Sequence, residues 1–344
     1  MTKPNGKIKF AVAGCGYIGK KHAALIQDHP ECDLVALMDV KPKDSLGIEA
    51  FSLPFFDDLP SMLAQMPEID VLCICTPNAC HAQQAMVALD YKKHVVIEKP
   101  MGLSKAECEQ VLHKALNQSR QVFCVMQNRY SPPAAWLKKM VEEKRLGQIR
   151  LVQLNCFWNR DDRYYFKDGQ RHEWHGRKAL DGGTLYTQFA HFIDIMYWVF
   201  GDIKKIKARF DNFEHQHSTD FEDTGLVMFD FVNGGKGCLQ FSTAVWDKNF
   251  ESTITILGSK GSIKLGGQYM NRLEYCHIDN YEAPVLEESL PANQYAGYQG
   301  SAANHHYVFD NVVEVLKERT QPTTNALEGM KVVDIIERIY RAGQ

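Results

Sequence analysis

A glycine-rich turn near the start of the chain has the composition of a phosphate-binding site. It follows an apolar segment, Ile8–Ala13, opens a segment with helical spacing, and reads Gly14, Cys15, Gly16, Tyr17, Ile18, Gly19. In a G-x-G-x-x-G string, the first glycine permits the tight turn, the second lets backbone approach a pyrophosphate, and the third lets helix and strand pack closely. The first helical N–H groups then face the phosphates. The string therefore predicts a dinucleotide site.

The end of the second predicted strand carries the residue that should select the dinucleotide. Asp39 is placed to accept hydrogen bonds from the adenosine ribose, and its charge repels a 2′-phosphate. This favours NAD over NADP. Lys41 and Lys43 lie close by in the sequence and keep NADP open as an alternative cofactor.

Two further stretches place polar side chains at the ends of apolar runs. Thr76, Pro77 and Asn78 end one run, with His81 shortly after, and Glu98, Lys99 and Pro100 end the next. In open parallel sheets, ligands bind beyond the carboxyl ends of the strands. Both stretches are therefore expected to meet the nicotinamide end of the cofactor. The Lys99-Pro100 bond is a candidate cis peptide bond.

The strings G-C-G-Y-I-G, T-P-N-A-C-H and E-K-P, in this order and spacing, resemble the Gfo/Idh/MocA family, which includes glucose–fructose oxidoreductase and inositol dehydrogenase. The resemblance covers nearly the whole chain. It implies a Rossmann domain followed by an α/β domain with a large, open, mainly antiparallel sheet, through which family members commonly form dimers or tetramers. It also implies NAD(P)-dependent hydride transfer between nicotinamide and a secondary hydroxyl of a sugar, polyol or nucleotide sugar.

The resemblance assigns two catalytic residues. Lys99 would contact the reacting hydroxyl, where an ammonium stabilises developing alkoxide character and can relay a proton. His191 matches the family histidine and is the candidate general base, because imidazole titrates near the operating pH. Thr187 and Asp194, four residues before and three after His191, are expected on the same face of one helix. A hydrogen-bonded core histidine is the alternative interpretation of His191.

The second-domain segment departs from the family pattern at two positions. Thr187 stands where the family often has aspartate, and Phe189 stands where it has glycine. Threonine cannot serve as a carboxylate base, so His191 and Lys99 would have to carry proton transfer. Nucleotide-sugar dehydrogenases of the family also use an uncharged residue at the position of Thr187.

Two segments supply the substrate-binding candidates. Asn128 and Arg129 resemble the family's N-R-[FY] element, which lines the cleft. The string F-W-N-R-D-D-R-Y-Y-F resembles a segment of the nucleotide-sugar and sugar-uronate branch. Within it, Arg160 or Arg163 would pair with a carboxylate or phosphate, and Trp158 and Tyr164 would stack on a sugar or base. The alternative is a surface loop with ordinary arginine–aspartate pairs.

These residues need two kinds of sheet to position them. The first third alternates buried apolar runs with helical patterns, which predicts a doubly wound parallel sheet. After about residue 130, successive strands without intervening helices predict an antiparallel sheet, with a hairpin at Asn233-Gly234-Gly235. One helix is expected over 184–200 and another from Asn325 with a capping box to Glu328. We therefore expect a dinucleotide-binding domain over 1–128 and a substrate-binding and oligomerisation domain over 129–344.

Composition excludes several other classes of protein. The net charge of −3, without a basic run, argues against nucleic-acid binding, and no apolar run is long enough for a membrane span. The ten cysteines form no C-x-x-C pair and are expected to be reduced thiols in a cytoplasmic protein. No histidine cluster has the spacing of a helix zinc site, so no metal is expected.

Two alternatives to a simple dehydrogenase use the same residues differently. An NAD-dependent glycoside hydrolase would oxidise the 3-hydroxyl only transiently and regenerate the cofactor. A non-catalytic dinucleotide-binding protein would keep the glycine turn but lose the lysine–histidine pair, and both Lys99 and His191 are present.

Overall fold

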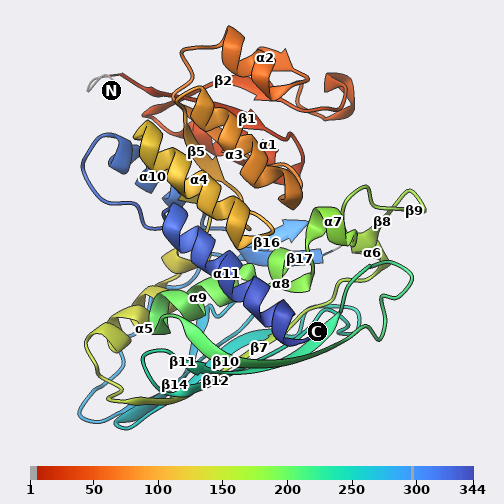
Figure 1. The fold of residues 1–344 in the computed structure, drawn as a ribbon. Coiled ribbons are helices and arrows are strands. Elements are labelled where there is room, and N and C mark those ends of the chain that lie inside the picture. Colours follow the sequence, from red (N-terminus) through yellow and green to blue (C-terminus); the bar gives the residue numbers. More distant parts are fainter. Residues whose placement is uncertain (1–5, 296–297) are drawn as a thin grey trace. The chain divides into compact units, whose positions relative to one another are not determined.

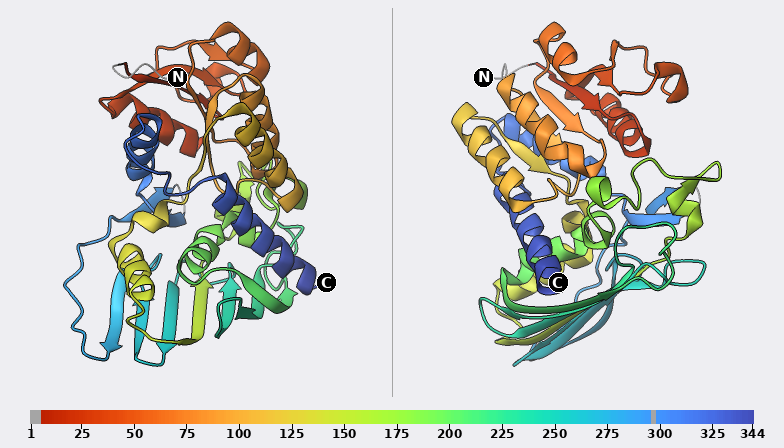
Figure 2. Two further views of the ribbon diagram at one scale, coloured as in Figure 1. Left: turned by 60° about the vertical axis from the view of Figure 1, so that its left-hand side comes forward. Right: turned by 45° about the vertical axis from the view of Figure 1, so that its right-hand side comes forward.

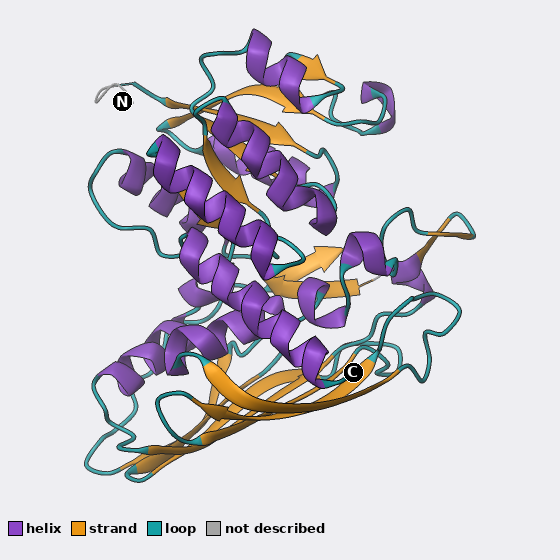
Figure 3. Cartoon of the chain, in the orientation of Figure 1, coloured by secondary structure: helices purple, strands orange, loops and turns teal. Residues whose placement is uncertain are grey.

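The computed structural model describes residues 6–295 and 298–344, which form two compact units (Figure 1). The first unit contains residues up to 126 together with 305–333, and the second contains 127–304 and 334–344. Each unit is built around its own sheet, as Figure 3 shows by its colouring of the strands.

The first unit is an α/β domain with a six-stranded parallel sheet in the order β3-β2-β1-β4-β5-β6. Its strands are β1 (Ile8–Ala13), β2 (Cys32–Met38), β3 (Phe55–Phe56), β4 (Val71–Ile74), β5 (His94–Ile97) and β6 (Val122–Cys124). Its helices are α1 (Tyr17–Asp28), α2 (Leu59–Gln65), α3 (His81–Asp90), α4 (Lys105–Gln118) and α10 (His305–Leu316). The strand order reverses beside β1, which is the topology predicted for a dinucleotide-binding fold.

The apolar runs of this unit are its core, and α10 completes it. Every residue of β4 is buried, as a parallel strand covered on both faces requires. The α10 helix packs on α1, and its Phe309 ring meets Phe10 of β1 edge-on with ring centroids 6.0 Å apart. The segment 305–333 therefore belongs to the first unit, although its place in the sequence predicts it in the second domain. Local sequence patterns carry no record of which distant core a helix joins.

The second unit is built on a seven-stranded mixed sheet in the order β10-β11-β12-β7-β13-β14-β15. Its strands are β7 (Ile149–Phe157), β10 (Ile203–Asp211), β11 (Thr224–Phe231), β12 (Lys236–Ser242), β13 (Glu251–Gly258), β14 (Gly261–Gly266) and β15 (Arg272–Ile278). Two small hairpins pair β8 (Phe166–Lys167) with β9 (Gln170–Arg171) and β16 (Ala292–Tyr295) with β17 (Tyr298–Ala302). Its helices are α5 (Pro132–Glu142), α6 (Asp162–Tyr165), α7 (Lys178–Asp181), α8 (Thr184–Thr187) and α9 (Ala190–Phe200). The α11 helix (Ala326–Ala342) contributes residues to both units.

Helices cover one face of this sheet. The covered face carries a row of buried apolar residues across neighbouring strands: Val227, Leu239, Leu154, Ile254 and Leu265. The next row along, on the opposite face, contains Met228 and Tyr275, which are 60% and 54% exposed. Figure 2 shows α5 and α9 on one side of the strands, and no described helix of this unit on the other.

Several local predictions are confirmed. The Lys99-Pro100 bond is cis, and β11 and β12 form the expected hairpin at Asn233-Gly234-Gly235. Asn325 and Glu328 form the capping box, each side chain accepting from the other's backbone N–H. All ten cysteines are free thiols. Among the described residues, no helix has the length and apolar character needed to cross a membrane.

One structural prediction was wrong. The helix expected over 184–200 is broken into α8 and α9 at Gln188 and Phe189. The sheet of the second unit is mainly antiparallel, as predicted, and β7 and β12 run parallel in its centre. The segment 159–180 contains α6, the β8–β9 hairpin and most of α7.

Candidate active site

The glycine turn of the first unit has the geometry that its sequence predicts. Gly14 has φ +89°, and a Cβ there would lie 2.6 Å from the carbonyl oxygen of Cys75 on the neighbouring strand end. A Cβ at Gly19 would collide with the carbonyl of Gly14. A Cβ at Gly16, by contrast, would meet nothing within 4 Å. Two glycines therefore close the turn, and the middle one leaves room at the start of α1, where a pyrophosphate fits.

Asp39 is tied to this turn. Its carboxylate accepts hydrogen bonds from the backbone N–H of Cys15 at 2.7 Å and of Lys41 at 3.0 Å. A carboxylate has about four lone-pair positions, so acceptor capacity remains for a ribose diol. A hollow of about 650 Å³ beside it is lined by Val40, Lys43, Phe55 and other residues. These residues fit the adenosine half of a dinucleotide.

Lys99 lies directly after β5, beside the end of β4. Ile97 pairs with Ile74 in the sheet, so the chain segments that follow them leave the same edge side by side. The ring of His81 joins them, with Nδ1 2.7 Å from the carbonyl oxygen of Pro100 and Nε2 2.8 Å from that of Thr76. His81 is 1% exposed, and burial lowers its pKa below 6.5. Its contacts support a role in holding these two ends together.

The T-P-N string, Thr76 to Asn78, follows the end of β4. The Thr76 hydroxyl donates to Gln84 Oε1 at 2.8 Å, and the Asn78 side chain is buried. Pro77 precedes the short helical turn that begins at Asn78. All three residues lie at the carboxyl edge of the sheet, as their position after the strand predicts.

Glu98 lies in a buried polar cluster. His22 Nε2 lies 3.0 Å and His305 Nε2 3.7 Å from its Oε1, and the backbone N–H of Lys99 donates to Oε2 at 3.1 Å. Burial by itself raises the pKa of Glu98, but the His22 hydrogen bond and the nearby His305 and Lys99 charges lower it to about 2. Glu98 is therefore a carboxylate whose oxygens face protein groups.

The same cluster has the composition of a metal site, since the ligand atoms of His22, Glu98 and His305 lie within 4.8 Å of one another. The Cys75 sulfur lies 3.3 Å from His22 Nδ1. Burial raises the pKa of the Cys75 thiol, so this thiol stays protonated. Its S–H group donates a hydrogen bond to His22 Nδ1. His22 then carries its own proton on Nε2, facing Glu98. Cys75, His22 and Glu98 thus form a chain of hydrogen bonds, and His305 lies beside the same carboxylate oxygen.

In the second unit, His191 lies in the first turn of α9 and is 3% exposed. The amide nitrogen of Gln127 lies 3.3 Å from His191 Nε2 and 3.3 Å from the carbonyl oxygen of Ala302. An amide N–H₂ that donates to both makes Nε2 an acceptor, so the neutral ring carries its proton on Nδ1. A neutral imidazole with an unprotonated nitrogen is the form that a general base requires.

Thr187 is turned toward the segment before it. Its hydroxyl bonds to the side chain of Asp181 and, at 3.1 Å, to the Asp181 carbonyl. The helix ends at Thr187, and Phe189 has φ −116° and ψ 6° before α9 begins. The prediction of one continuous helix through Thr187 and His191 is therefore wrong, although both residues lie at the adjoining ends of α8 and α9.

Arg129 and Asp194 bind one another. Arg129 Nε donates to Asp194 Oδ2 at 2.9 Å and Nη2 donates to Oδ1 at 2.6 Å, and neither side chain has exposed surface. The Arg129 guanidinium also lies over the Trp198 ring, 5.3 Å from its centre. Asn128 beside it accepts from the Ser301 hydroxyl at 2.7 Å. These bonds attach the segment 127–130 to α9 and to β17, which supports a positioning role in place of the substrate contact expected for Asn128, Arg129 and Asp194.

The segment 157–166, which holds the F-W-N-R-D-D-R-Y-Y-F string and is called the aromatic loop below, is an internal scaffold over much of its length. Arg160 is 1% exposed, and its guanidinium donates to Gln188 Oε1 at 2.7 Å and to the carbonyl oxygens of Asn159 and Gln299. Trp158 is 2% exposed, and its ring N–H donates to the Ser252 hydroxyl at 2.8 Å. Because their polar groups are bonded internally, Arg160 and Trp158 do not offer the anion-binding and stacking surfaces expected from the sequence.

Tyr164 belongs to the same scaffold. Its hydroxyl accepts from Gln188 at 2.9 Å, and its ring stacks on His175 with centroids 4.3 Å apart. Arg163 is different, because its side chain is 46% exposed and pairs with Asp161 and Asp247. It lines a hollow of about 360 Å³ together with Lys248, Asn249, Tyr298 and other residues. Arg163 is therefore the accessible arginine of this loop.

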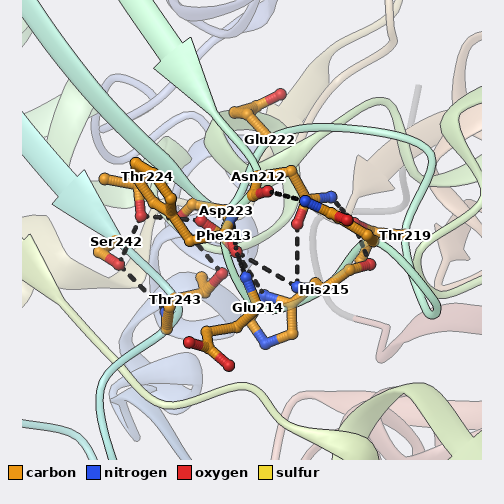
Figure 4. A network of polar contacts seen from close by, with 12 residues as sticks. Asn212, Phe213, Glu214, His215, Thr219, Glu222, Asp223, Thr224, Ser242 and Thr243 are labelled. Atoms are coloured by element: carbon orange, nitrogen blue, oxygen red, sulfur yellow. Dashed lines mark hydrogen bonds and ion pairs between the residues drawn. The ribbon is translucent and has the colours of Figure 1, made fainter.

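A second polar network fixes the loop 212–219 at one end of the sheet, and Figure 4 shows it from close by. Asp223 Oδ2 accepts from the backbone N–H of Phe213 at 2.9 Å and of Glu214 at 2.7 Å, and it lies 3.3 Å from His215 Nδ1. Burial by itself raises the pKa of Asp223, but these hydrogen bonds bring it below 3.8. The His215 ring packs on Tyr165 at 5.3 Å, so the network supports the aromatic loop.

Several residues of these networks are not predicted to be functional from the sequence. His22 occupies the buried stripe of α1 with Gly19, Ala23 and Ile26, and its polarity within that stripe is the only local signal. Gln127 precedes the N-R-Y string, and Gln188 lies next to Thr187, but neither carries a recognisable pattern of its own. Their roles depend on partners between 28 and 175 positions away.

Comparison with known proteins adds independent evidence. Residues 8–126 match the oxidoreductase family with an NAD-binding Rossmann fold, GFO_IDH_MocA, and residues 135–264 match the GFO/IDH/MocA C-terminal domain. The WlbA dehydrogenase from Bordetella pertussis, solved with NADH and UDP-GlcNAcA, superposes with a TM-score of 0.85 and 29% identity. That match covers 98% of this chain and 96% of WlbA.

Two curated relatives extend the range of known chemistry. Inositol 2-dehydrogenase from Salmonella typhimurium is 25% identical over 66% of this chain and 65% of its own length. The 2,7-anhydro-N-acetylneuraminate hydratase from Escherichia coli is 25% identical over 76% of this chain and 68% of its own length.

A Rossmann unit with a closed glycine turn, followed by an α/β unit on an open sheet, defines a nicotinamide-dependent oxidoreductase. The chain belongs to the Gfo/Idh/MocA family, and its first domain binds NAD. Its relatives include dehydrogenases of polyols and nucleotide sugars.

Proposed function

We propose that this protein is an NAD-dependent dehydrogenase of a nucleotide sugar, and that it oxidises a secondary hydroxyl of a sugar-uronate unit. The similarity to WlbA over nearly the whole of both chains carries this proposal, because that enzyme was solved with UDP-GlcNAcA. Thr187 adds support, since its hydroxyl is bonded to Asp181 and supplies no carboxylate base at this position.

Within this proposal, the two candidate catalytic groups have complementary roles. His191 takes the proton of the substrate hydroxyl through Nε2, and the substrate hydroxyl replaces Gln127 as the partner of this nitrogen. Lys99 stabilises the negative charge that develops on the oxygen. The glycine turn and Asp39 would hold NAD, which would supply the hydride acceptor for the same carbon. The products are a ketone, NADH and one proton, so atoms and electrons balance.

The test is an assay of NADH formation by absorbance with UDP-N-acetylglucosaminuronate, its parent UDP-sugar and myo-inositol. We expect NADH with the uronate, and Lys99→Ala should lower turnover by at least about 100-fold, the scale of a lost acid–base group. Lys105→Ala is the matched control, because Lys105 is a partly exposed lysine on α4 that pairs with Glu109. A Lys99→Ala enzyme with normal turnover would remove Lys99 from the mechanism.

A second candidate is an NAD-dependent lyase, hydratase or glycoside hydrolase that oxidises its substrate only transiently. The similarity to the E. coli hydratase favours it. Such an enzyme consumes its sugar without accumulating NADH. Substrate loss followed by chromatography, with no change in absorbance, would select this function over a dehydrogenase.

We also propose that the uncovered face of the seven-stranded sheet associates with a second copy of the chain. Leu226 and Met228 are two residues apart on β11, so both side chains project from that face, and they are 57% and 60% exposed. Exposed apolar side chains that share a sheet face mark an association surface. Light scattering should report a dimer or tetramer, and Met228→Lys should shift it toward the monomer.

A further inference from the structure

The polar cluster around Glu98 connects the strand end that carries Lys99 to three other parts of the first unit. His22 comes from α1, Cys75 follows β4, Glu98 follows β5, and His305 opens α10. Relative exposures are 0% for His22, 7% for Cys75 and Glu98, and 2% for His305. A buried polar group lowers the stability of the fold unless it is hydrogen-bonded. Four such groups in one cluster therefore need hydrogen bonds to one another or to other protein groups.

The sheet register explains why these groups meet. Ile74 pairs with Ile97, and Glu98 donates its backbone N–H to the Ile74 carbonyl at 3.0 Å. Cys75 and Glu98 are therefore neighbours at the ends of adjacent strands. His22 lies on the face of α1 that packs on the sheet.

The hydrogen bonds run in one direction through the cluster. The protonated Cys75 thiol donates to His22 Nδ1 at 3.3 Å, and His22 Nε2 donates to Glu98 Oε1 at 3.0 Å. His305 Nε2 lies 3.7 Å from the same oxygen. The second carboxylate oxygen, Oε2, accepts the backbone N–H of Lys99 at 3.1 Å. One carboxylate thus connects the two histidines to the backbone of the lysine.

Aromatic packing fixes the histidine rings. The His22 ring meets the Phe309 ring edge-on at 5.1 Å and the His305 ring at 5.8 Å. Because Phe309 and His305 both belong to α10, this helix holds the His22 ring in place. A ring fixed by packing keeps its donor aimed at one carboxylate oxygen.

We infer that His22, Glu98 and His305 form a positioning unit that fixes the backbone of Lys99 and so directs its side chain. This inference rests on the proposed catalytic role of Lys99. It assigns Glu98 to positioning in place of the cofactor contact expected from the sequence, and it gives α10 a part in catalysis.

The inference predicts a loss of turnover without a loss of cofactor binding. A misplacement of about 1 Å in a catalytic group can cost about 100-fold in rate. We therefore expect His22→Ala and Glu98→Gln each to lower kcat by at least about 10-fold. The glycine turn and Asp39 do not belong to the cluster, so the Kd for NAD should stay within about 2-fold.

A conservative variant separates positioning from general structural support. The amide N–H of glutamine can replace the Nε2–H of His22 as donor to Glu98, so His22→Gln should restore kcat to within about 3-fold of the wild type. His113→Asn is the matched control, because His113 is an exposed histidine of the same unit on α4. Each variant is compared by NADH formation with UDP-N-acetylglucosaminuronate, NAD binding by calorimetry and thermal unfolding.

The outcomes distinguish the inference from the proposed function. Reduced kcat in His22→Ala and Glu98→Gln, with NAD binding kept and His22→Gln restored, supports the positioning unit. Normal kcat in both, in an enzyme that Lys99→Ala inactivates, overturns the inference and leaves the proposed function intact. Equal losses of kcat, NAD binding and thermal stability in all His22 and Glu98 variants also overturn it. Normal kcat in Lys99→Ala removes Lys99 from the mechanism and overturns the inference with it, whereas a wild type that forms no NADH from the nucleotide sugar overturns the proposed function itself.

Discussion

Replacing Glu222 by glutamine should stabilise the protein at alkaline pH and leave it nearly unchanged at acidic pH. Glu222 lies in the second unit just before β11, and the Tyr340 hydroxyl donates to its Oε1 at 2.6 Å. The backbone N–H of Thr184 donates to the same oxygen at 3.3 Å. Burial outweighs these bonds and raises the pKa of Glu222 from 4.5 to about 7.

The pKa difference sets the sign and the size of the effect. Between about pH 4.5 and pH 7 the folded protein keeps a proton on Glu222 that the unfolded chain has released. The free energy of unfolding therefore falls as pH rises through this window and stays lower above it. At about 1.4 kcal/mol per pH unit, the full difference is about 3 kcal/mol, an upper bound because the site relaxes. Glutamine does not ionise, and its amide oxygen can accept the same two hydrogen bonds.

The assay is urea unfolding of the wild type and Glu222→Gln at about pH 5 and about pH 8. The advantage of the variant should grow by about 1 to 3 kcal/mol between these conditions. Glu287→Gln is the control, because Glu287 is an exposed glutamate of the same unit and should show no such trend. An advantage of Glu222→Gln that is the same at both pH values would refute the reasoning.

Two further substitutions test the cofactor site and the helix that carries His191. Asp39→Ala removes the acceptor of two backbone N–H groups beside the glycine turn, so calorimetry should show a loss of NAD affinity of at least about 10-fold, and unchanged affinity would exclude Asp39 from the site. Asp194→Asn leaves the buried Arg129 charge uncompensated and should lower the free energy of unfolding by about 3 to 5 kcal/mol, measured in urea. The double variant Arg129→Met, Asp194→Leu should lose less than Asp194→Asn; a larger loss would contradict the pairing.

The cofactor site could be predicted from sequence because its determinants are local. The glycine string, the preceding strand and the start of α1 lie within a dozen residues, and the steric reason for each glycine is the same wherever the turn occurs. The parallel sheet was equally predictable, since fully buried strands read as uninterrupted apolar runs. The family pattern added Lys99 and His191.

The substrate-side residues were harder to predict because their partners decide what they do. Arg160 and Arg163 belong to one short string, yet one is buried against Gln188 and the other lines a hollow. Arg129 was expected to face substrate, but its guanidinium forms an ion pair with the carboxylate of Asp194, 65 positions away. Sequence identifies a guanidinium but not the direction in which the fold turns it.

The sequence by itself determined the NAD-binding turn, the parallel, doubly wound character of the first sheet and the candidate lysine and histidine. Only the tertiary structure showed that α10 returns to the first unit, that β7 and β12 run parallel, and that α8 and α9 are separate. The physical reason is the distance along the chain over which each feature is set. A turn or a strand is fixed by neighbouring residues, whereas a buried carboxylate such as Glu98 is fixed by histidines 76 positions before it and on a distant helix after it.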